Sequence, residues 1–500
     1  MPQDHDPART ALPPVFPIAL DRGTSFWAGG RVATGGAPWK VLRFKDAALP
    51  YLGVLRRAGA RGAAADSAVG RALARQLLDH GLAHPVPASR PGPHAVTVVV
   101  PAFGRVDELE RCLAALKGLP VIVVDDGSPD PGPLRRMARA HGTRLVRHEV
   151  NRGPAAARNT GLRLADTPFV AFVDSDCRPV EGWLDVLIPY FDDPRVAAVA
   201  PRIVPGAGSS RLLARYEAAR SALDMGFRPA LVRPRAKLGF VPTATLVVRA
   251  AVLRDITFDE EMRLGEDVDF VWRLADRGMH VRYQPEAQVE HTPRLEARAW
   301  ARRRHEYGTS APALARRHPG RLVPLSPSAW NLATLAFLAS GHPWRAASSA
   351  VLTTALLTRR LTGTHEAWTL SAAIVGKGVI ADAAAIGHAL RREWWPLGLV
   401  CLAAGGRSRA ARCAATAMLA PVALEWLTHR PALDPVRYTA LRLLEDVAYG
   451  SGVTASAWRH RSLEPLLPRL RDSPVPALRD GVRWLVGRRT TRRPPEGRRR

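Results

Sequence analysis

The sequence predicts an α/β protein, with a parallel β-sheet in its central domain, a small unit before that domain and a helical region after it. Between residues 94 and 312, short apolar segments alternate with segments whose apolar residues recur at helical spacing. Strands that are buried on both faces of a parallel sheet have such continuous apolar sequences. Two of these segments end in aspartates. Ligands bind at the carboxyl ends of the strands in open sheets of this class, so the aspartates mark a candidate site.

The N-terminal unit spans residues 1–84. Two glycine-containing segments, 27–31 and 34–38, are typical of turns around a hairpin, and Val41–Phe44 has the composition of a strand. A helix that ends near Gly81 is predicted by apolar residues at helical spacing, which are Val69, Leu73, Leu77 and Leu78. Together these elements indicate a small winged-helix-like unit. A stiff, proline-rich linker at residues 85–93 follows it.

The central domain, residues 94–312, has the βαβ pattern that gives a parallel sheet. Its predicted strands are 96–100, 121–124 and 169–173, which are largely apolar, and 144–148. Helices are predicted between them, at 109–116 from an apolar stripe, near 134–140, and after Gly153.

Residues 320–485 are rich in Ala, Leu and Trp and are predicted to be helical. Two uncharged stretches lie there: Leu322–Trp344, which contains three prolines, and Trp394–Gly406. A spanning helix needs about 20 apolar residues, so we expect packed or interfacial helices rather than membrane spans. The arginine-rich tail at 486–500 is expected to be disordered. Such a tail suits an anionic membrane surface, and it is equally suited to exposure to solvent.

The composition excludes a wholly disordered chain and a small disulfide-stabilised protein, since 47% of the 500 residues are hydrophobic. The formal net charge of +27 points to an anionic partner, such as a phosphorylated substrate, anionic lipid or nucleic acid, or else to an arginine-rich genome. The four cysteines form no Cys-x-x-Cys pair, which fits a reducing compartment. We expect no signal peptide and a cytoplasmic protein, because no basic and then apolar segment begins the chain.

The chemistry is expected at three strand ends, which face the same crevice. They are Pro101–Phe103, Asp125–Asp126 and Asp174–Asp176. Asp174 and Asp176 are two residues apart, so in extended chain they share a face and repel each other unless a cation lies between them. Carboxylate oxygens suit Mg²⁺ or Mn²⁺ held together with substrate phosphates. The alternative is that both carboxylates cap the next helix.

Further polar segments lie downstream. Glu266 and Asp267 stand at a helix entry, where they face the crevice or serve only as first-turn charges, as Asp269 does. The segment 151–159 begins a helix whose N-terminus, with Arg158 nearby, favours phosphate, although proline at this place is also ordinary for a helix. Arg302, Arg303 and Tyr307 shape an acceptor or diphosphate site, or else belong to a plain basic helix.

Six segments occur in the order found in family 2 inverting glycosyltransferases, and over residues 95–295 the chain resembles that family. They are Val98–Phe103, Val123–Ser128, Asn151–Asn159, Asp174–Asp176, Gly265–Phe270 and Val289–His291. The resemblance implies a GT-A (Rossmann-like) fold and a nucleoside-diphosphate sugar donor, usually a UDP-sugar. It also implies an inverting displacement, in which a carboxylate takes the acceptor proton and Mg²⁺ or Mn²⁺ stabilises the leaving diphosphate.

The resemblance implies a role for each motif residue. Asp126 would contact uracil, and the other donor-binding residues would be Pro101, Phe103, Arg158 and Asp174. The metal would be held by Asp176, with Asp174 and His291. Asp267 would be the catalytic base, and Glu266 its neighbour at the acceptor.

The flanking segments resemble the glycosyltransferases of mycofactocin systems. The segments are Trp27–Val32, Val41–Phe44, Arg75–Pro85 and Arg302–Gly308. This resemblance implies transfer of β-1,4-linked glucose from UDP-glucose to the peptide-derived redox cofactor mycofactocin or its precursor, at the inner face of the cell membrane. A family 2 enzyme acting on a cell-envelope lipid or polysaccharide would share every core motif. A basic nucleic-acid-binding protein would leave the ordered carboxylates unexplained, so we expect no nucleic-acid partner.

Overall fold

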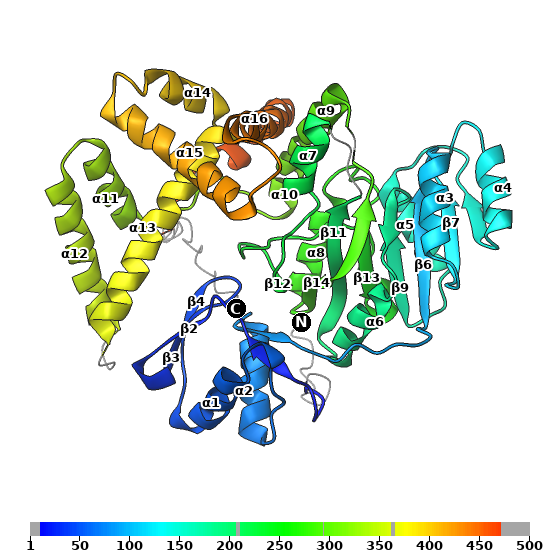
Figure 1. The fold of residues 1–500 in the computed structure, drawn as a ribbon, viewed down its shortest axis with the longest axis horizontal. Helices are drawn as coiled ribbons and strands as arrows, with labels where there is room; N and C mark the ends of the chain where they lie inside the picture. The colour runs from blue at the N-terminus through cyan, green and yellow to red at the C-terminus, as the bar shows by residue number, and fades with distance from the viewer. Residues whose placement is uncertain (1–10, 207–210, 294, 362–365, 472–500) are drawn as a thin grey trace, which may run out of the picture. The chain divides into compact units, whose positions relative to one another are not determined.

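The computed structural model describes residues 11–206, 211–293, 295–361 and 366–471 (Figure 1). The chain forms two compact units. The first comprises Met1–Leu322 and Val422–Pro465, and the second comprises Val323–Pro421 and Leu466–Arg500. The helical region expected at 320–485 is therefore divided between two units, and the basic tail at 486–500 lies outside the described residues.

An N-terminal domain with its own core begins the first unit. Strand β1 (Ile18–Leu20) pairs with β5 (Ala83–Pro85), and a second sheet has the order β2-β3-β4, formed by Ser25–Trp27, Val32–Gly35 and Lys40–Arg43. Helices α1 (Leu49–Ala58) and α2 (Ala68–Asp79) cover them. The hairpin, the strand at 41–44 and the helix at 69–78 were predicted. Val69 is exposed, however, so the buried stripe of α2 consists of Leu73, Leu77 and Leu78.

The central sheet of the first unit has nine strands among the described residues, in the order β10-β14-β11-β13-β9-β6-β7-β8, with β12 paired to β14. The predicted strands are β6 (Val96–Ala102), β7 (Val121–Asp125), β8 (Arg144–Arg147) and β9 (Phe169–Val173), and they are parallel. The others are β10 (Cys177–Pro179), β11 (Val196–Pro205), β12 (Ala230–Val232), β13 (Thr245–Arg249) and β14 (His280–His291). Because β13 is antiparallel to both β9 and β11, the sheet is mixed, rather than wholly parallel as expected.

Helices cover both faces of this sheet, because its strands are apolar on both sides (Figure 1). One face packs against α3 (Val106–Ala115), α4 (Gly132–Ala140) and α6 (Trp183–Leu187). The other face packs against α5 (Pro154–Arg163) and α8 (Glu266–Asp276). The carboxyl ends of β6, β7 and β9 thus lie at one edge of a rigid core, as the sequence predicts.

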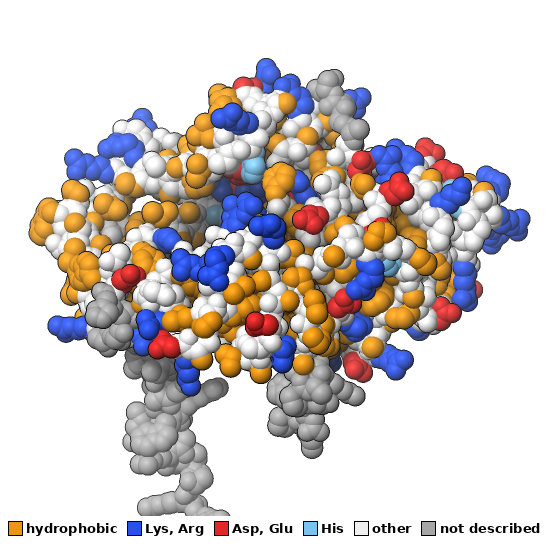
Figure 2. Space-filling model, turned by 60° about the horizontal axis from the view of Figure 1, so that its bottom comes forward, with side chains coloured by type: hydrophobic (Ala, Val, Ile, Leu, Met, Phe, Trp, Pro, Cys, Tyr) orange, Lys and Arg blue, Asp and Glu red, His pale blue; other side chains and the backbone are white. Residues whose placement is uncertain are grey.

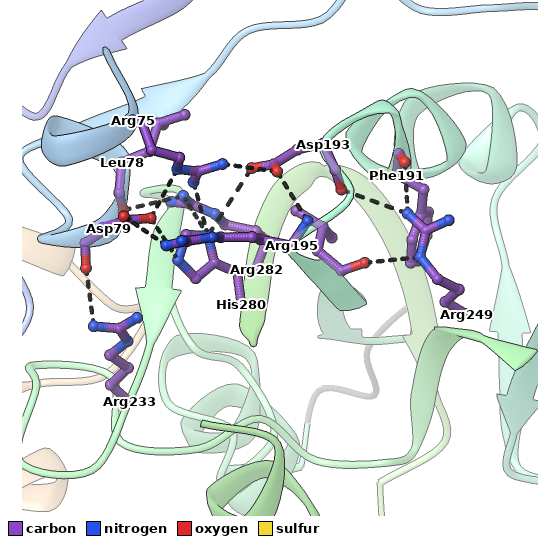
Figure 3. A network of polar contacts seen from close by, with 11 residues as sticks. Arg75, Leu78, Asp79, Phe191, Asp193, Arg195, Arg233, Arg249, His280 and Arg282 are labelled. Carbon is purple, nitrogen blue, oxygen red and sulfur yellow. Dashed lines mark hydrogen bonds and ion pairs between the residues drawn. The ribbon is translucent and has the colours of Figure 1, made fainter. Parts of the chain in front are cut away.

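A buried polar network joins the N-terminal domain to the central sheet (Figure 3). Arg75 on α2 donates to Asp193 at 2.8 Å, and Asp79 accepts from Arg195 at 2.7 Å. His280, the first residue of β14, is fully buried, and its Nδ1 lies 3.3 Å from Nη2 of Arg75. Since guanidinium groups only donate, this nitrogen accepts and the imidazole is neutral. Burial accordingly lowers the pKa of His280 to about 4.

The C-terminal helix α16 (Pro435–Arg459) belongs to the first unit because it packs against α9 (Ala297–Thr309). A Cβ atom on Gly452 would lie 2.0 Å from the carbonyl oxygen of His305, and one on Gly308 would lie 2.1 Å from that of Tyr449. Only glycine allows the two helices to approach so closely. Arg304 of α9 also donates to Glu217 on α7 (Leu212–Ala219) and to Glu445 on α16, at 2.5 and 3.0 Å.

The second unit is helical. It contains α11 (Ala329–Ala339), α12 (Pro343–Arg360), α13 (Ala367–Arg391), α14 (Trp395–Ala404) and the part of α15 (Arg409–His429) before Val422. Within it, Asn331 donates to the buried carboxylate of Asp382 at 2.7 Å. Among the described residues, α13 is the one helix long and apolar enough to cross a membrane. Sequence analysis overlooked it because Lys377 and Asp382 interrupt its apolar sequence.

Candidate active site

The aspartates after β7 organise the loops around one end of the crevice. Asp126 is buried, and its carboxylate accepts from the backbone N–H groups of Arg152 and Gly153 at 2.9 and 2.7 Å and contacts Nδ1 of His148 at 2.8 Å. The amides that precede α5, which the sequence suggested for phosphate, thus bind this carboxylate. Neighbouring Asp125 accepts from the backbone N–H of Ser128 and pairs with Arg147.

Arg158 connects two parts of the predicted site. Its side chain is 4% exposed and lies on α5, where Nη2 donates to Asp174 at 2.8 Å and Nη1 donates to Glu266 at 2.9 Å. One buried guanidinium therefore holds the end of β9 beside the beginning of α8. These three residues lie far apart in the sequence, and the structure brings them together.

Asp176 forms a second cluster next to this one. Its Oδ2 accepts from Nη1 of Arg105 at 2.7 Å, and Nε2 of His291 lies 3.6 Å from the same oxygen. Burial alone would raise the pKa of Asp176, but the contacts with His291 and Arg105 hold it below its usual value. A cavity of about 250 Å³ is lined by two of the three predicted metal residues, Asp176 and His291, and by Thr292 and Glu290, whereas Asp174 does not line it.

Asp267 lies in the first turn of α8, next to Glu266. Burial and the adjacent carboxylate of Glu266 raise the pKa of Asp267 to about 7. The helix begins at Gly265, which has a φ of +83°, and a Cβ there would lie 3.0 Å from side-chain atoms of Leu314 and Ser310. Glycine therefore permits the sharp turn at the start of α8, where both acids lie.

Other residues of the predicted set occupy less constrained positions. Phe103, after β6, is 50% exposed, and Pro101 is half-buried near the end of this strand. Asp269, one turn into α8, is fully buried and accepts from Arg273, Arg317 and His318, so it anchors the helix, as its first-turn position suggested. On α9, Arg302 and Arg303 both pair with Glu306.

Sequence analysis missed Arg105, Arg147 and His148. Each contacts an aspartate that was predicted, across 71, 22 and 22 residues of sequence respectively. Arg105 comes two residues after the first motif, and Arg147 and His148 are the last two residues of the third predicted strand. A basic residue at the end of a strand next to an acidic one is the signal that could have identified them.

Comparison with known proteins identifies the family of the chain. The family model described as "Glycosyl transferase family 2" matches residues 97–256. The pre-mycofactocin glycosyltransferase of Mycobacterium tuberculosis is 38% identical over 474 residues, which cover 92% of this chain and 99% of the relative. Glycosyltransferase AglE of Haloferax volcanii is 27% identical over 199 residues, 37% of this chain and 62% of the relative.

A solved structure of a mannosyltransferase from Pyrobaculum calidifontis, in complex with GDP-Man and Mn²⁺, is 24% identical and has a TM-score of 0.36. The matched region covers 59% of this chain and 89% of the mannosyltransferase chain.

The relative with 38% identity spans nearly the whole chain, so the similarity extends beyond the matched core into the regions on either side of it. The central domain, with its mixed sheet covered by helices on both faces, has a GT-A-like fold. The chain therefore belongs to glycosyltransferase family 2, in the same family as the pre-mycofactocin glycosyltransferase.

Proposed function

We propose that this transferase moves glucose from UDP-glucose, with inversion, onto the peptide-derived redox cofactor mycofactocin or its precursor. The product would carry β-linked glucose, extended as a β-1,4-linked oligoglucose. The acceptor is suggested by the name of the relative that shares 38% of its residues over 92% of this chain. The observation that supports the chemistry best is the Arg158 bridge, because it holds the carboxylate after β9 beside the start of α8.

A carboxylate base that lies next to the bound sugar donor suits a single displacement at the anomeric carbon. Asp267, with a pKa of about 7, is half-ionised near neutral pH and can take the proton of an acceptor hydroxyl as the hydroxyl attacks the anomeric carbon. Attack from the side opposite the leaving group inverts the configuration, so an α-linked donor gives a β-linked product. Phe103, which is exposed beside the crevice, has a free face for a nucleobase.

The residues also suit Mg²⁺ or Mn²⁺. Asp176, Asp174 and His291 would hold the ion, and their oxygen and imidazole ligands are of the kind that Mn²⁺ accepts. The contact of His291 with Asp176 at 3.6 Å brings two of these ligands together at the cavity. Asp174 is bound by Arg158 and does not line this cavity, and no group of three or more His, Cys, Asp or Glu residues that could hold a metal occurs among the described residues. Asp174 would therefore have to move to join the other two ligands, and donor phosphate oxygens would complete the coordination. The ion would stabilise the charge of the departing diphosphate.

The second unit has the two features that bind a peripheral protein to an anionic membrane. Large hydrophobic side chains are exposed on its helices, among them Trp344, Ile380 and Val400, each more than 60% exposed. Exposed cations accompany them, which are Arg345, Arg359, Arg360, Lys377, Arg407, Arg409 and Arg412. Glu366 is the one exposed acidic residue in the described part of 323–421. Figure 2 shows hydrophobic and basic side chains together at the left edge, where Figure 1 has α11 and α12.

Apolar contact and attraction to anionic lipid reinforce each other, so we propose that this unit holds the enzyme at the inner face of the cell membrane. Flotation with vesicles tests this. The protein should float with vesicles that contain anionic lipid and should do so less as salt rises. Equal flotation with neutral vesicles, or none with either, contradicts the proposal.

The function is tested by a donor screen with the full chain and Mn²⁺ or Mg²⁺, which follows the release of nucleoside diphosphate. Release of UDP from UDP-glucose that depends on the modified-peptide acceptor supports the proposal. Turnover only with membrane lipid extract or polysaccharide as the acceptor would instead make the protein a cell-envelope transferase.

A further inference from the structure

The two arginines that contact the strand-end aspartates differ in freedom. Arg158 is fixed, because its side chain is 4% exposed and two carboxylates hold it. The side chain of Arg105 is 35% exposed and reaches only one carboxylate among the described residues, that of Asp176. Of the two, Arg105 can therefore leave its partner without leaving an unpaired charge buried in the core.

The carboxylate of Asp176 already has cationic and imidazole neighbours. Arg105 Nη1 lies 2.7 Å from its Oδ2, and His291 Nε2 lies 3.6 Å from the same atom. A divalent cation on this oxygen would repel the guanidinium at such a distance. Pairing of Asp176 Oδ2 with Arg105 and binding of a divalent cation at the same oxygen therefore disfavour each other.

The backbone conformation fixes the position of the Arg105 Cα atom, whereas the side chain can still change its conformation. Gly104 and Arg105 have φ values of +61° and +49°, which place a non-glycine residue in the left-handed region just before α3. The carbonyl oxygen of Arg105 accepts from the N–H of Leu109 and so belongs to the first turn of the helix. A conformation that most side chains avoid is retained here, and it aims this guanidinium at the crevice.

We propose that Arg105 is an internal counter-cation for Asp176, which gives up this carboxylate when the nucleotide and the divalent cation bind and then pairs with the diphosphate. This proposal rests on the proposed function, since it assumes a nucleotide donor and a cation at Asp176. A released guanidinium suits the diphosphate because it can donate two parallel hydrogen bonds to phosphate oxygens. Arg105 would then be a positioning and binding residue that couples the two ligands.

The proposal requires a particular thermodynamic pattern. Without nucleotide, the cation must displace Arg105 and therefore binds weakly. With nucleotide, the guanidinium gains a new partner, so the nucleotide strengthens cation binding and, by linkage, the cation strengthens nucleotide binding to the same extent.

Calorimetric titration of the full chain with Mn²⁺, alone and with saturating UDP, tests this pattern. Without UDP, Arg105→Gln should bind Mn²⁺ about fivefold more tightly than the unchanged protein, equivalent to about 1 kcal/mol. With Mn²⁺ present, the same variant should bind UDP about fivefold more weakly. Arg105→Lys, which keeps the charge, should stay closer to the unchanged protein in both titrations. Arg139→Gln is the matched control, because Arg139 is an exposed arginine on α4 and does not line the cavity at Asp176 and His291.

Two results overturn the proposal. If Arg105→Gln binds Mn²⁺ no more tightly than the unchanged protein without UDP, Arg105 does not compete for Asp176. If Arg139→Gln changes both affinities as much as Arg105→Gln, the effect is one of general charge. Asp176→Asn separates these failures from that of the proposed function. If Asp176→Asn abolishes Mn²⁺ binding, the proposed metal site is supported. If the unchanged protein binds no Mn²⁺ even with UDP, both the role of Arg105 and the proposed metal site are refuted.

Discussion

The ionisation of Asp267 should set the pH dependence of transfer. Burial and the neighbouring carboxylate of Glu266 together raise its pKa to about 7. The base works only when deprotonated, so about one-eleventh of the enzyme is active at one pH unit below this pKa and about ten-elevenths at one unit above. The value of kcat/KM should therefore rise about tenfold between pH 6 and pH 8 and then level off.

Glu266→Gln isolates one cause of this shift. The glutamine side-chain oxygen can still accept from Nη1 of Arg158, which lies 2.9 Å from Glu266. The substitution removes the negative charge beside Asp267. The rising limb of the profile should therefore move to lower pH. Asp267→Asn is the reference, because it removes the base and should lower turnover by about 10² to 10⁴ while UDP still binds.

The assay is the release of UDP at subsaturating acceptor, across a pH series at constant ionic strength, with UDP affinity measured at each pH as the control. A profile that is flat between pH 6 and pH 8, or one that Glu266→Gln leaves in place, would refute this account of the base. So would near-normal turnover by Asp267→Asn.

Three further predictions concern stability, each measured by urea unfolding. Arg158→Met leaves two carboxylates without their shared partner, one of them buried, and should cost about 3 kcal/mol at neutral pH; no loss would mean that the bridge is not formed. The pKa of His280 is about 4 in the folded protein, so as the pH falls the unfolded chain takes up a proton on this residue before the folded chain does. The free energy of unfolding should therefore fall by about 2 kcal/mol from pH 7 to pH 5. His280→Gln should make that fall smaller, and an equal fall in the variant would contradict the assignment. Gly452→Ala places a Cβ 2.0 Å from a carbonyl oxygen and should cost about 1–3 kcal/mol, whereas Gly376→Ala, with open space around it, should cost nothing.

Local sequence was sufficient for the half of the sheet built from βαβ units. The strands at 96–102, 121–125 and 169–173 are largely apolar runs, and their burial on both faces makes that pattern clear. The edge strand at 144–147 has only two apolar residues, and its position between two predicted helices identified it. The aspartates at the ends of β7 and β9 were found for the same reason, because the end of a buried strand is visible in the sequence.

The other half of the sheet depends on pairings that no local pattern specifies. Strand β13 is inserted between β9 and β11 in the antiparallel direction, and this placement is decided by packing of the whole sheet. The position of α16 is similar. Helix α16 itself does not require glycine at position 452. The requirement comes from the close approach of the His305 carbonyl oxygen on α9.

The site shows the same division. Residue types predicted the acids, but their partners come from distant segments, as Arg105 does for Asp176 and Arg158 does for Glu266. The sequence also suggested phosphate at the amides before α5. These amides instead bind Asp126, an anion supplied by the chain itself, and only the folded arrangement reveals that contact.

The most direct test of the account is the structure of the transferred sugar. The protein would be incubated with UDP-glucose, Mn²⁺ and the modified-peptide acceptor, and the product would be examined by proton NMR at its anomeric position. The account predicts one or more glucose units in β-linkage on this acceptor, with none formed by Asp267→Asn. An α-linked product would contradict a single displacement by an acceptor that Asp267 deprotonates, and glucose found only on lipid or polysaccharide would contradict the proposed acceptor.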